Sequence, residues 1–357
     1  MSVFKESKGT WRSIYRYTNW RGERKQTQKR GFKTRREALE WEREQMLKKA
    51  SALNMTFASF LEIYSADMKI RLKQNTWLTK ESIITKRVLP FFSLMKMDEI
   101  TSKDIIRWQN EMMAGTDKHG KPFSQTYLKT MHNQVSAIFN HAVRFYDLKN
   151  NPATKVGSIG KKEAPEMLFW TKDEYLKFSD AMMDKPISYY AYEILYWTGI
   201  RLGELLALTP DDFDLGKGTV SISKSYQRIG GKDVITDPKT VKGNRLVKMP
   251  DFLTDEVSEY LKSIYGVEPG SRVFPISKSY LHHEMNRGVK ATGVKHIRVH
   301  DLRHSHVSLL IEMGFSAVAI ADRVGHESID ITYRYAHLFP SRQNEIAEKL
   351  NFEKGVF

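Results

Sequence analysis

The hydrophobic period changes along this chain, and the changes divide it into segments with different folds. Between Trp11 and Tyr17, aromatic side chains alternate with Arg12 and Arg16, which is the two-residue period of a strand. After Thr56, apolar residues recur at helical spacing, and strand-like runs return only between residues 219 and 248. The pattern predicts a mainly helical protein with small β-sheets, arranged in three domains.

The first domain, residues 1–52, has the pattern of a three-stranded sheet backed by one helix. A turn signal at Asn19–Gly22 separates two strand-like runs, and Thr34 with Glu37 forms a capping-box pattern before a helix. The expected elements are strands at about residues 4–8, 11–17 and 25–32 and a helix that runs to about residue 49.

The second domain, residues 56–153, has the pattern of a four-helix bundle. Residues with capping side chains precede apolar runs at helical spacing, and prolines follow two of these runs. The expected helix starts include Thr56, Thr101 and Ser124, and the second and fourth helices are expected to end near Pro90 and before Pro152.

Residues 154–166 lack an apolar period and are predicted to be a linker before a third domain, residues 167–357. This domain is expected to be mostly helical with one small antiparallel sheet. The expected helices cover about residues 171–183, 186–197, 201–208, 253–264, 277–291, 300–313, 316–323 and 328–337, and the expected strands cover 219–226, 234–236 and 246–248.

The composition indicates a polyanionic partner. The formal net charge is +15 and the isoelectric point is near 9.6. The chain has no cysteine, which excludes disulfides and cysteine-ligated zinc and is compatible with a reducing cytoplasm. No apolar run approaches the roughly 20 residues of a membrane span, and the N-terminus lacks the apolar core of a signal peptide. We therefore expect a cytoplasmic protein that binds nucleic acid and no membrane.

The third domain carries an ordered set of polar residues that suits one chemical task. Its members are Arg201 in Thr198-Gly199-Ile200-Arg201-Leu202-Gly203-Glu204, a basic hairpin from Pro238 to Arg245, His300-Asp301-Leu302-Arg303, Val324-Gly325-His326, and Tyr335-Ala336-His337. Arginines, a lysine and histidines can hold a phosphodiester and stabilise its charge while a phenol attacks it. An ordinary Arg–Glu pair within a helix would explain Arg201 and Glu204 alone, but not the whole set.

The order and local contexts of these residues resemble the tyrosine recombinases, most closely the integrases of temperate phages and conjugative transposons. The resemblance covers most of the chain. It implies an N-terminal arm-site DNA-binding domain, a core-binding helical domain and a catalytic domain. It also implies catalytic roles for Tyr335, Arg201, Lys239, His300, Arg303 and His326, and supporting roles for Glu204, His337 and Lys242. Val324 departs from the leucine of the family's Leu-Gly-His motif, which should affect packing rather than chemistry.

Three assignments within the set stay open. Lys239 best matches the lysine that would protonate the departing oxygen, and Lys242 is its rival in the same turn. Tyr333 competes with Tyr335, although on a helix their side chains would diverge by about 200°. His300 and His304 have the i, i+4 spacing of metal ligands, but no HExxH pattern accompanies them, so we expect no metal. The chain also lacks a Walker-type loop, so no nucleotide cofactor is expected.

Basic residues of the first two domains are candidate DNA contacts, which the interleaving of aromatic and basic residues favours in the first domain, whereas a merely solvated face is nearly as good an explanation in the second. Those expected to bind DNA are Arg12, Arg16, Lys25, Lys29, Arg30 and Lys129, with Lys80, Lys86 and Arg87 as further possibilities.

The resemblance implies a site-specific DNA recombinase that integrates and excises a mobile element or prophage. It would act through a 3′-phosphotyrosine and a Holliday junction as a homotetramer on core and arm sites. A host DNA-bending protein and an excision factor are implied partners. Ile346, Leu350 and Phe352 have helical spacing, so the tail after Ser341 is expected to pack on a neighbouring protomer. The alternatives are a type IB topoisomerase and a noncatalytic DNA-binding regulator.

Overall fold

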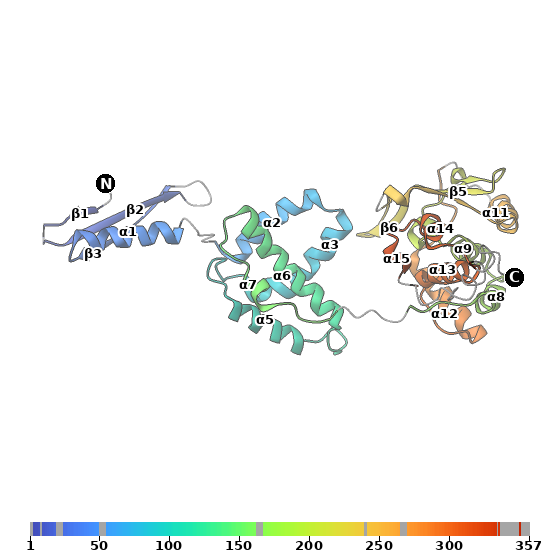
Figure 1. The fold of residues 1–357 in the computed structure, drawn as a ribbon, viewed down its shortest axis with the longest axis horizontal. Coiled ribbons are helices and arrows are strands. Elements are labelled where there is room, and N and C mark those ends of the chain that lie inside the picture. Colours follow the sequence, from blue (N-terminus) through green and yellow to red (C-terminus); the bar gives the residue numbers. More distant parts are fainter. Residues whose placement is uncertain are drawn as a thin grey trace. The chain divides into compact units, whose positions relative to one another are not determined.

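The computed structural model describes residues 3–7, 9–18, 24–49, 55–161, 167–238, 241–264, 270–333, 335 and 350. The chain divides into two compact units, Met1–Ala164 and Pro165–Phe357 (Figure 1). The division falls within the segment 154–166 for which the sequence predicts a linker.

The N-terminal sheet is antiparallel, with the strand order β1-β2-β3, and α1 packs on one of its faces. Ser13 of β2 and Ala38 of α1 are both fully buried, so they mark the covered face. The predicted capping residues begin α1, because Glu37 N–H donates to Thr34 Oγ1 at 3.2 Å. The elements are β1 (Val3–Lys5), β2 (Trp11–Thr18), β3 (Arg24–Phe32) and α1 (Arg35–Lys49).

The same unit contains a helical bundle with an aromatic core. Phe57, Phe92, Trp108 and Phe139 are fully buried, and burying a side chain of this size contributes about 2 kcal/mol. The predicted caps act as expected, since Thr56 and Ser124 accept backbone N–H bonds and Thr101 forms a capping box with Asp104. The helices are α2 (Phe57–Arg71), α3 (Gln74–Ile83), η1 (Ile84–Val88), α4 (Leu89–Phe92), α5 (Ser102–Ala114), α6 (Gln125–Phe145) and α7 (Pro152–Val156).

The second helix of the bundle ends at Phe92, near Pro90 as predicted, but the proline lies inside it and does not terminate it. The chain passes from α3 through a π-helical turn, η1, into α4, which contains Pro90 in its first turn. The backbone is widened just before Pro90, because the Leu89 N–H bonds to the Ile84 carbonyl five residues back. The wider π turn joins the two α-helical parts without a break.

The first residues of the predicted linker pack on the bundle. Asn151 caps α7 by accepting the Ala153 N–H at 2.8 Å, and Ile159 is only 8% exposed within the bundle core. Gly160 lies so close to α6 that an added Cβ would be 2.1 Å from the Gln125 carbonyl oxygen.

The second unit is mostly helical and contains short antiparallel strands. Its helices are α8 (Lys172–Asp180), α9 (Pro186–Thr198), α10 (Leu202–Leu205), η2 (Pro210–Asp212), η3 (Val241–Gly243), α11 (Asp251–Ser263), α12 (Lys278–Thr292), η4 (Val299–Asp301), α13 (Leu302–Glu312), α14 (Ala317–Val324) and α15 (Asp330–Tyr333). Its strands are β4 (Phe213–Asp214), β5 (Thr219–Ile222), β6 (Ser225–Ile229), β7 (Lys232–Thr236) and β8 (Arg245–Lys248). The mainly helical fold with small antiparallel sheets is the one predicted.

The strands of this unit differ from the prediction in two respects. They form two sheets, β4-β5-β8 and β6-β7, because the run predicted as one strand over 219–226 breaks between Ile222 and Ser225. Consequently the basic segment from Pro238 to Arg245 does not close a hairpin. It runs from β7 in one sheet to β8 in the other, and its last residue, Arg245, is the first residue of β8 and pairs with Ile222 of β5.

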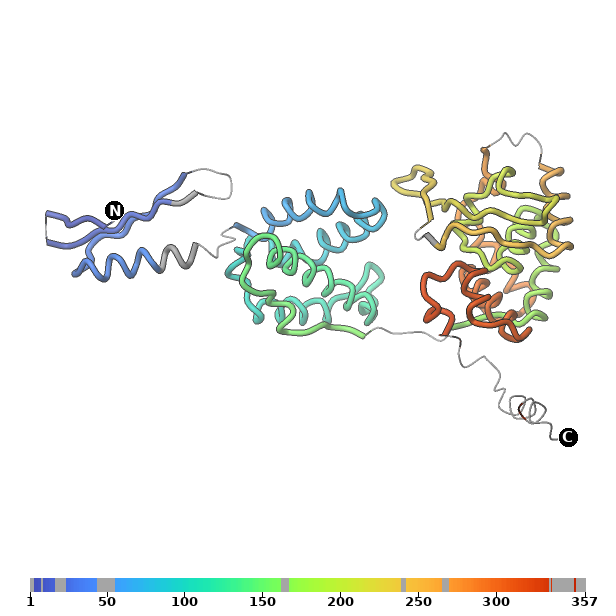
Figure 2. The backbone as a smooth tube through the Cα atoms, turned by 45° about the horizontal axis from the view of Figure 1, so that its top comes forward, coloured from blue at the N-terminus to red at the C-terminus, as the bar shows by residue number. Residues whose placement is uncertain are grey.

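The core of the second unit surrounds α9. Tyr192, Ile194, Leu195 and Tyr196 of this helix are buried on several sides, and Tyr196 stacks on Tyr175 with ring centroids 3.6 Å apart. In Figure 2 the red segment that contains α13, α14 and α15 lies to one side of the yellow strands. This segment has a small core of its own, formed by Val307, Ile311, Ile320, Val324 and Tyr335.

The helix predicted over residues 328–337 is much shorter than expected. It is a single turn, α15, and Tyr335 lies in a turn beyond it. The two candidate tyrosines nevertheless diverge, because Tyr333 is 53% exposed whereas Tyr335 is 2% exposed.

Candidate active site

The candidate site begins where α9 ends. Gly199 adopts the left-handed conformation, with φ at 68°, and terminates the helix. Arg201 follows as the N-cap residue of α10, and its Nη1 donates to Glu204 Oε1 at 2.8 Å. Its Nη2 donates to the Gly325 carbonyl at 3.2 Å. This short turn therefore fixes the direction of the Arg201 guanidinium, which stays partly exposed.

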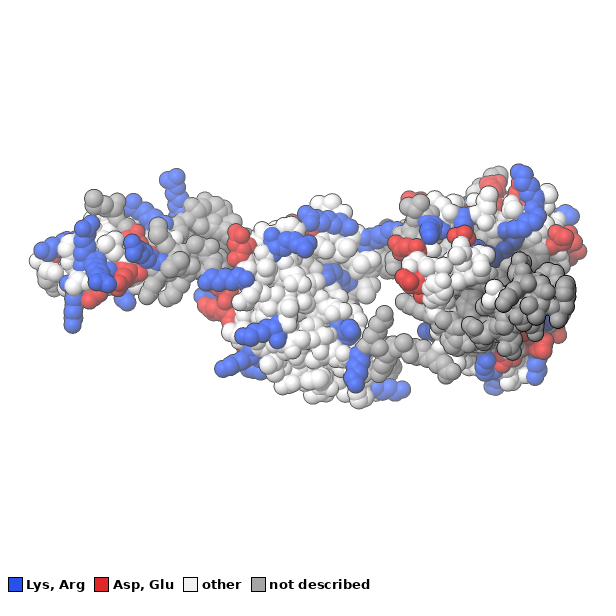
Figure 3. All heavy atoms as spheres, viewed as in Figure 1, with Lys and Arg blue, Asp and Glu red and all other residues white. Residues whose placement is uncertain are grey.

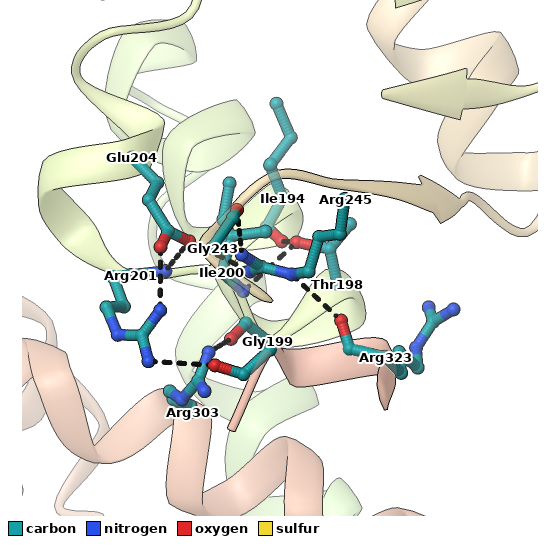
Figure 4. Close-up of polar contacts among 11 residues, drawn as sticks. Ile194, Thr198, Gly199, Ile200, Arg201, Glu204, Gly243, Arg245, Arg303 and Arg323 are labelled. Atoms are coloured by element: carbon teal, nitrogen blue, oxygen red, sulfur yellow. Dashed lines mark hydrogen bonds and ion pairs between the residues drawn. The ribbon is translucent and has the colours of Figure 1, made fainter. Parts of the chain in front are cut away.

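Glu204 holds two arginines at once (Figure 4). Its carboxylate is buried and also accepts Nη2 of Arg245 at 2.8 Å. Burial acts to raise the pKa of Glu204, but the hydrogen bond and charge of Arg245, together with Arg201, outweigh it and lower the pKa. Glu204 is therefore ionised at neutral pH, and it holds the Arg201 guanidinium in place by a hydrogen bond.

Arg303 lies beside Arg201 in the first turn of α13. Its Nη1 donates to the Gly199 carbonyl at 2.8 Å, whereas its buried Nη2 has no hydrogen-bond partner among the described residues. Burial and the nearby charge of Arg201 lower the pKa of Arg303 to about 9, so it still carries its charge at neutral pH. An unpaired buried N–H of a cation is costly unless a ligand satisfies it.

His300 and His326 border the two arginines. His300 lies in η4 with its ring partly open to solvent, and desolvation on its protein side, together with Arg303, lowers its pKa. His326 is 5% exposed, and its Nδ1 lies 2.8 Å from Thr332 Oγ1. Burial and the arginine charges lower the pKa of His326 to about 3. Both rings are therefore neutral at pH 7 in the free protein.

Gly325 connects this site to the basic crossover segment. It has φ at 67°, and an added Cβ would lie 2.8 Å from the Lys242 carbonyl oxygen and 3.1 Å from Arg245. The turn that carries Lys242 therefore lies against the loop that carries His326. The Lys242 side chain is exposed, whereas Lys239 and His337 lie outside the described residues.

Tyr335 is buried next to these groups. Its hydroxyl hydrogen-bonds Nδ1 of His304, and its ring packs among Val307, Ile311 and Ile320. It is close enough to Arg303 for the two to interact electrostatically. The structure thus brings together Arg201, Arg303, His300, His326 and Tyr335 from separate segments of the sequence.

Sequence reasoning missed two residues of this site. His304 was considered only as a metal ligand, although its contact is with the Tyr335 hydroxyl. Arg245 was noted only as part of a pattern, although it is the buried partner of Glu204. The position of His304 four residues after His300 is a usable signal, because residues at this spacing share one face of a helix.

Within the part of the chain that the structure describes, no group of three or more His, Cys, Asp or Glu side chains is arranged to hold a metal ion. His304 and His306 have other contacts. His306 is buried and accepts a hydrogen bond from Arg323 Nε at 3.0 Å.

The strand register separates the basic residues of the N-terminal sheet. Lys29 pairs with Ser13, and Lys25 is four positions away in the same strand, so both point to the face that α1 covers. Arg12 and Arg16 point to the opposite, open face, where Arg12 lies 5.4 Å from the Phe4 ring. Arg30 is 3.7 Å from Glu6.

Most of the visible face of the helical bundle in Figure 3 is uncharged, and the charged side chains scattered over it are mainly Lys and Arg. Lys129 is half-buried on α6, and Lys80 Nζ donates to Gln134 at 2.7 Å. Burial lowers the pKa of Lys80 to about 8. Lys86 and Arg87 lie in the π turn, where the Arg87 guanidinium covers the Phe123 ring at 4.5 Å.

Three family models match consecutive parts of the chain: an arm DNA-binding domain at residues 1–49, a phage integrase N-terminal SAM-like domain at 56–113, and the phage integrase family at 167–342. The chain is 30% identical to the ICEBs1 integrase of Bacillus subtilis over 338 residues, 89% of this chain and 90% of that protein. The chain belongs to the phage integrase family of tyrosine recombinases.

Further relatives agree with this membership. The integrase of Staphylococcus phage L54a is 27% identical over 66% of this chain and 76% of its own length. Tyrosine recombinases of this family are enzymes that cut and rejoin DNA at specific sites, and this chain is therefore a tyrosine-type integrase.

Solved structures of integrases share the fold. The Tn1549 transposon integrase, solved with transposon right end DNA, matches with a TM-score of 0.66 and 20% identity, covering 84% of this chain and 99% of that one. A lambda integrase tetramer bound to a Holliday junction matches with a TM-score of 0.59 and 19% identity, covering 96% and 95%. Among the helices described for this integrase, none is long and apolar enough to cross a membrane.

Proposed function

We propose that this integrase cleaves DNA by attack of Tyr335 on a phosphodiester held between Arg201 and Arg303. The oxygen of Tyr335 forms a bond to phosphorus, and the bond from phosphorus to the 5′-oxygen breaks. The product is a 3′-phosphotyrosine, which conserves the energy of the broken bond. A 5′-hydroxyl from another strand then attacks the phosphotyrosine and joins new DNA.

The observation that carries this proposal is the buried, unpartnered Nη2 of Arg303. Its other terminal nitrogen is already bonded to the Gly199 carbonyl, and the Arg201 guanidinium beside it is partly exposed. A phosphodiester would satisfy Nη2 and neutralise two neighbouring cations. His300 and His326 would donate to the same phosphate as charge builds on it during attack.

The departing 5′-oxygen needs a proton, and the crossover segment supports a lysine as its source. The Lys242 carbonyl lies against Gly325, so the segment approaches the loop of His326. Lys239 is the general acid that we favour, with Lys242 as the rival. Sulfur leaves without protonation, so a substrate with a 5′-bridging sulfur should restore cleavage only to the variant that lacks the acid. Comparing Lys239→Ala with Lys242→Ala on both substrates therefore identifies it.

The N-terminal parts supply DNA binding. We assign contact with arm sites to the open face of the β1-β2-β3 sheet, which bears Arg12 and Arg16, and contact with core sites to the helical bundle. Two cleavages on each of two DNA sites call for four copies of the chain, which exchange strands through a Holliday junction. The tail after Ser341, which would hold neighbouring copies together, lies outside the described residues except for Leu350.

The biological role that fits these parts is the integration and excision of a mobile element or prophage in the bacterial cytoplasm. The relatives support this role, since they include the ICEBs1 integrase and the integrase of Staphylococcus phage L54a. A host DNA-bending protein and an excision factor would complete the reaction. Adding them to a recombination assay should change its efficiency or direction.

A nicked suicide substrate tests the proposed function. Cleavage near the nick releases a short fragment, so religation fails and a covalent protein–DNA adduct accumulates. The wild type should form the adduct, Tyr335→Phe should not, and Tyr333→Phe should behave as the wild type. An adduct formed by Tyr335→Phe would overturn the assignment. No adduct with the wild type on its own core site would favour a noncatalytic regulator.

A further inference from the structure

His304 makes a direct contact with the reacting atom. Its Nδ1 is hydrogen-bonded to the Tyr335 hydroxyl, although the two residues are 31 positions apart in the sequence. The rings are tilted by 52° with centroids 5.6 Å apart, so the contact is through the polar edge of the imidazole and not through stacking. The tyrosine is 2% exposed and the His304 side chain is 18% exposed, so the contact is largely buried.

The second nitrogen of His304 faces a carboxylate. Nε2 lies 3.8 Å from Asp301 Oδ1, which is too long for a strong hydrogen bond but close enough for electrostatic attraction. Asp301 is 1% exposed and is held by Arg298, whose Nη2 donates to Oδ1 at 2.8 Å. A neutral imidazole has one N–H, and the carboxylate favours that hydrogen on Nε2. Nδ1 is then a free acceptor for the phenol proton.

We propose that His304 is the general base of this integrase, taking the proton of Tyr335 during cleavage and returning it during rejoining, with Asp301 orienting the imidazole. This inference rests on the proposed function, in which Tyr335 is the nucleophile. The arrangement has the three parts of an activated nucleophile, which are an attacking hydroxyl, a base within hydrogen-bond reach and a group that orients the base.

The proton balance is complete without another reagent. As the Tyr335 oxygen bonds to phosphorus, its proton moves to Nδ1 and gives an imidazolium. The bond from phosphorus to the 5′-oxygen breaks, and the lysine of the crossover segment protonates that oxygen. In rejoining, a 5′-hydroxyl attacks phosphorus, and the imidazolium returns its proton to the departing phenolate oxygen.

The charges around His304 suit a base that is neutral before the reaction. Burial, the neighbouring His300, Arg298 and Arg303 lower the pKa of His304 to about 4, against the opposing pull of Asp301. His326 also lies within electrostatic range. A phosphodiester bound to Arg303 would neutralise part of this positive field and raise the proton affinity of His304. The base therefore becomes stronger when substrate is present.

His300 is less well situated for the same task. Its ring is edge-on to that of His304 at 5.6 Å, and no hydrogen bond joins it to Tyr335 among the described residues. Its partly open position suits a donor to the phosphate. In this proposal His304 therefore acts on the nucleophile, and His300 acts on the phosphate.

The test compares His304→Asn with the wild type on the nicked suicide substrate. Asparagine can still accept a hydrogen bond near the position of Nδ1, but it cannot take the proton. We expect adduct formation to slow about 10²-fold or more, while DNA affinity stays within about twofold. His282→Asn, an exposed histidine of α12, is the matched control and should react as the wild type.

The pH profile separates a base from a merely structural residue. The wild-type rate should rise with pH as His304 loses its proton and then level off. The rate of His304→Asn should rise in proportion to hydroxide up to about pH 9, because only the solvent can then remove the phenol proton. A substrate with a 5′-bridging sulfur should restore cleavage to the lysine variant that lacks the general acid. It should not restore cleavage to His304→Asn, which lacks the base.

The outcomes distinguish this inference from the proposed function. If the wild type forms an adduct that requires Tyr335, but His304→Asn keeps the wild-type rate and plateau, His304 is not the base and the proposed function survives. If no adduct forms with the wild type, the proposed function itself fails. Loss of DNA affinity in His304→Asn would show that the residue is structural and would overturn the inference.

Discussion

Glu204 and Arg245 form a buried ion pair, with Oε2 of one and Nη2 of the other 2.8 Å apart. Their side chains are 4% and 7% exposed, whereas Arg201, which binds the other carboxylate oxygen, is 40% exposed. Glu204 therefore anchors one arginine inside the protein and directs another outward to the proposed phosphate site. Arg245 in turn donates to the Arg323 carbonyl at 3.0 Å, which fixes the start of β8 to the end of α14.

Replacing Glu204 by glutamine should destabilise the catalytic unit. The change keeps the shape of the side chain but leaves the buried Arg245 charge unpaired, which costs about 3 kcal/mol. The measurement is hydrogen exchange of α9 and α10 amides in increasing urea. Asp214→Asn, in an exposed pair with Lys217, is the control and should change protection little. Equal protection in both variants would contradict the structural role of Glu204.

Arg303→Lys should impair cleavage more than DNA binding. A lysine can replace the bond to the Gly199 carbonyl but cannot also present a second, rigidly held N–H to a phosphate. Loss of one such donor lowers the rate of adduct formation about 10²- to 10³-fold. Arg287→Lys, which alters a surface ion-pair cluster on α12, is the control. Single-turnover adduct formation and DNA affinity should be measured together, and parallel losses in both would argue against a transition-state role.

Gly325→Ala should slow cleavage by displacing the His326 loop from the crossover segment. The added Cβ would lie 2.8 Å from the Lys242 carbonyl oxygen, and the left-handed backbone adds strain. Displacement of catalytic groups by about 1 Å can cost about 10²-fold in rate. Gly293→Ala is the matched control, because Gly293 has φ at 71° but nothing within 4 Å of an added Cβ. It should lower stability by about 1 kcal/mol and leave the rate unchanged. Equal rates in the two variants would show that the contact does not matter.

Local signals in the sequence were sufficient for most of the fold. Thr56, Ser124 and Thr171 cap the helices predicted to follow them, because a cap acts on backbone groups only a few residues away. Pro90 lies inside the helix that it was expected to end, because a π turn precedes it and spacing alone does not predict such a turn. Two-residue alternation places Lys25 and Lys29 of β3 on one face, but which face α1 covers follows only from the packing of the helix.

The candidate site was predictable as a set of residues but not as a set of contacts. The order of the polar motifs indicates the chemistry, and the structure brings five of the predicted residues together. The contact of His304 with Tyr335 depends on a turn after α15 that the helical pattern did not predict. The pairing of Glu204 with Arg245 joins residues 41 positions apart, and such long-range pairs leave no periodic signal.

His306→Gln should flatten the pH dependence of stability. Burial and the Arg323 charge lower the pKa of His306 to about 3, while the unfolded chain has the ordinary value near 6.5. The unfolded state therefore binds the proton first, and the folded state loses up to about 1.4 kcal/mol per pH unit as pH falls from 6.5 towards 3. Glutamine can still accept from Arg323 but does not titrate. Urea unfolding at several pH values, followed by exchange of α13 amides, should show a smaller slope in the variant, and equal slopes would contradict the assignment.

Arm-site DNA should distinguish the two faces of the N-terminal sheet. Arg16 is exposed on the open face, whereas Lys29 points to the face that α1 covers and lies 5.5 Å from the Phe32 ring. If the open face binds DNA, Arg16→Gln should weaken binding and reduce the slope of log affinity against log salt by about 1. Lys29→Gln removes the same charge from the same sheet and should change both quantities less. The measurement is a salt titration of arm-site binding with the full chain. A larger effect of Lys29→Gln would indicate that DNA binds the face of the sheet that α1 covers, and would contradict binding at the open face.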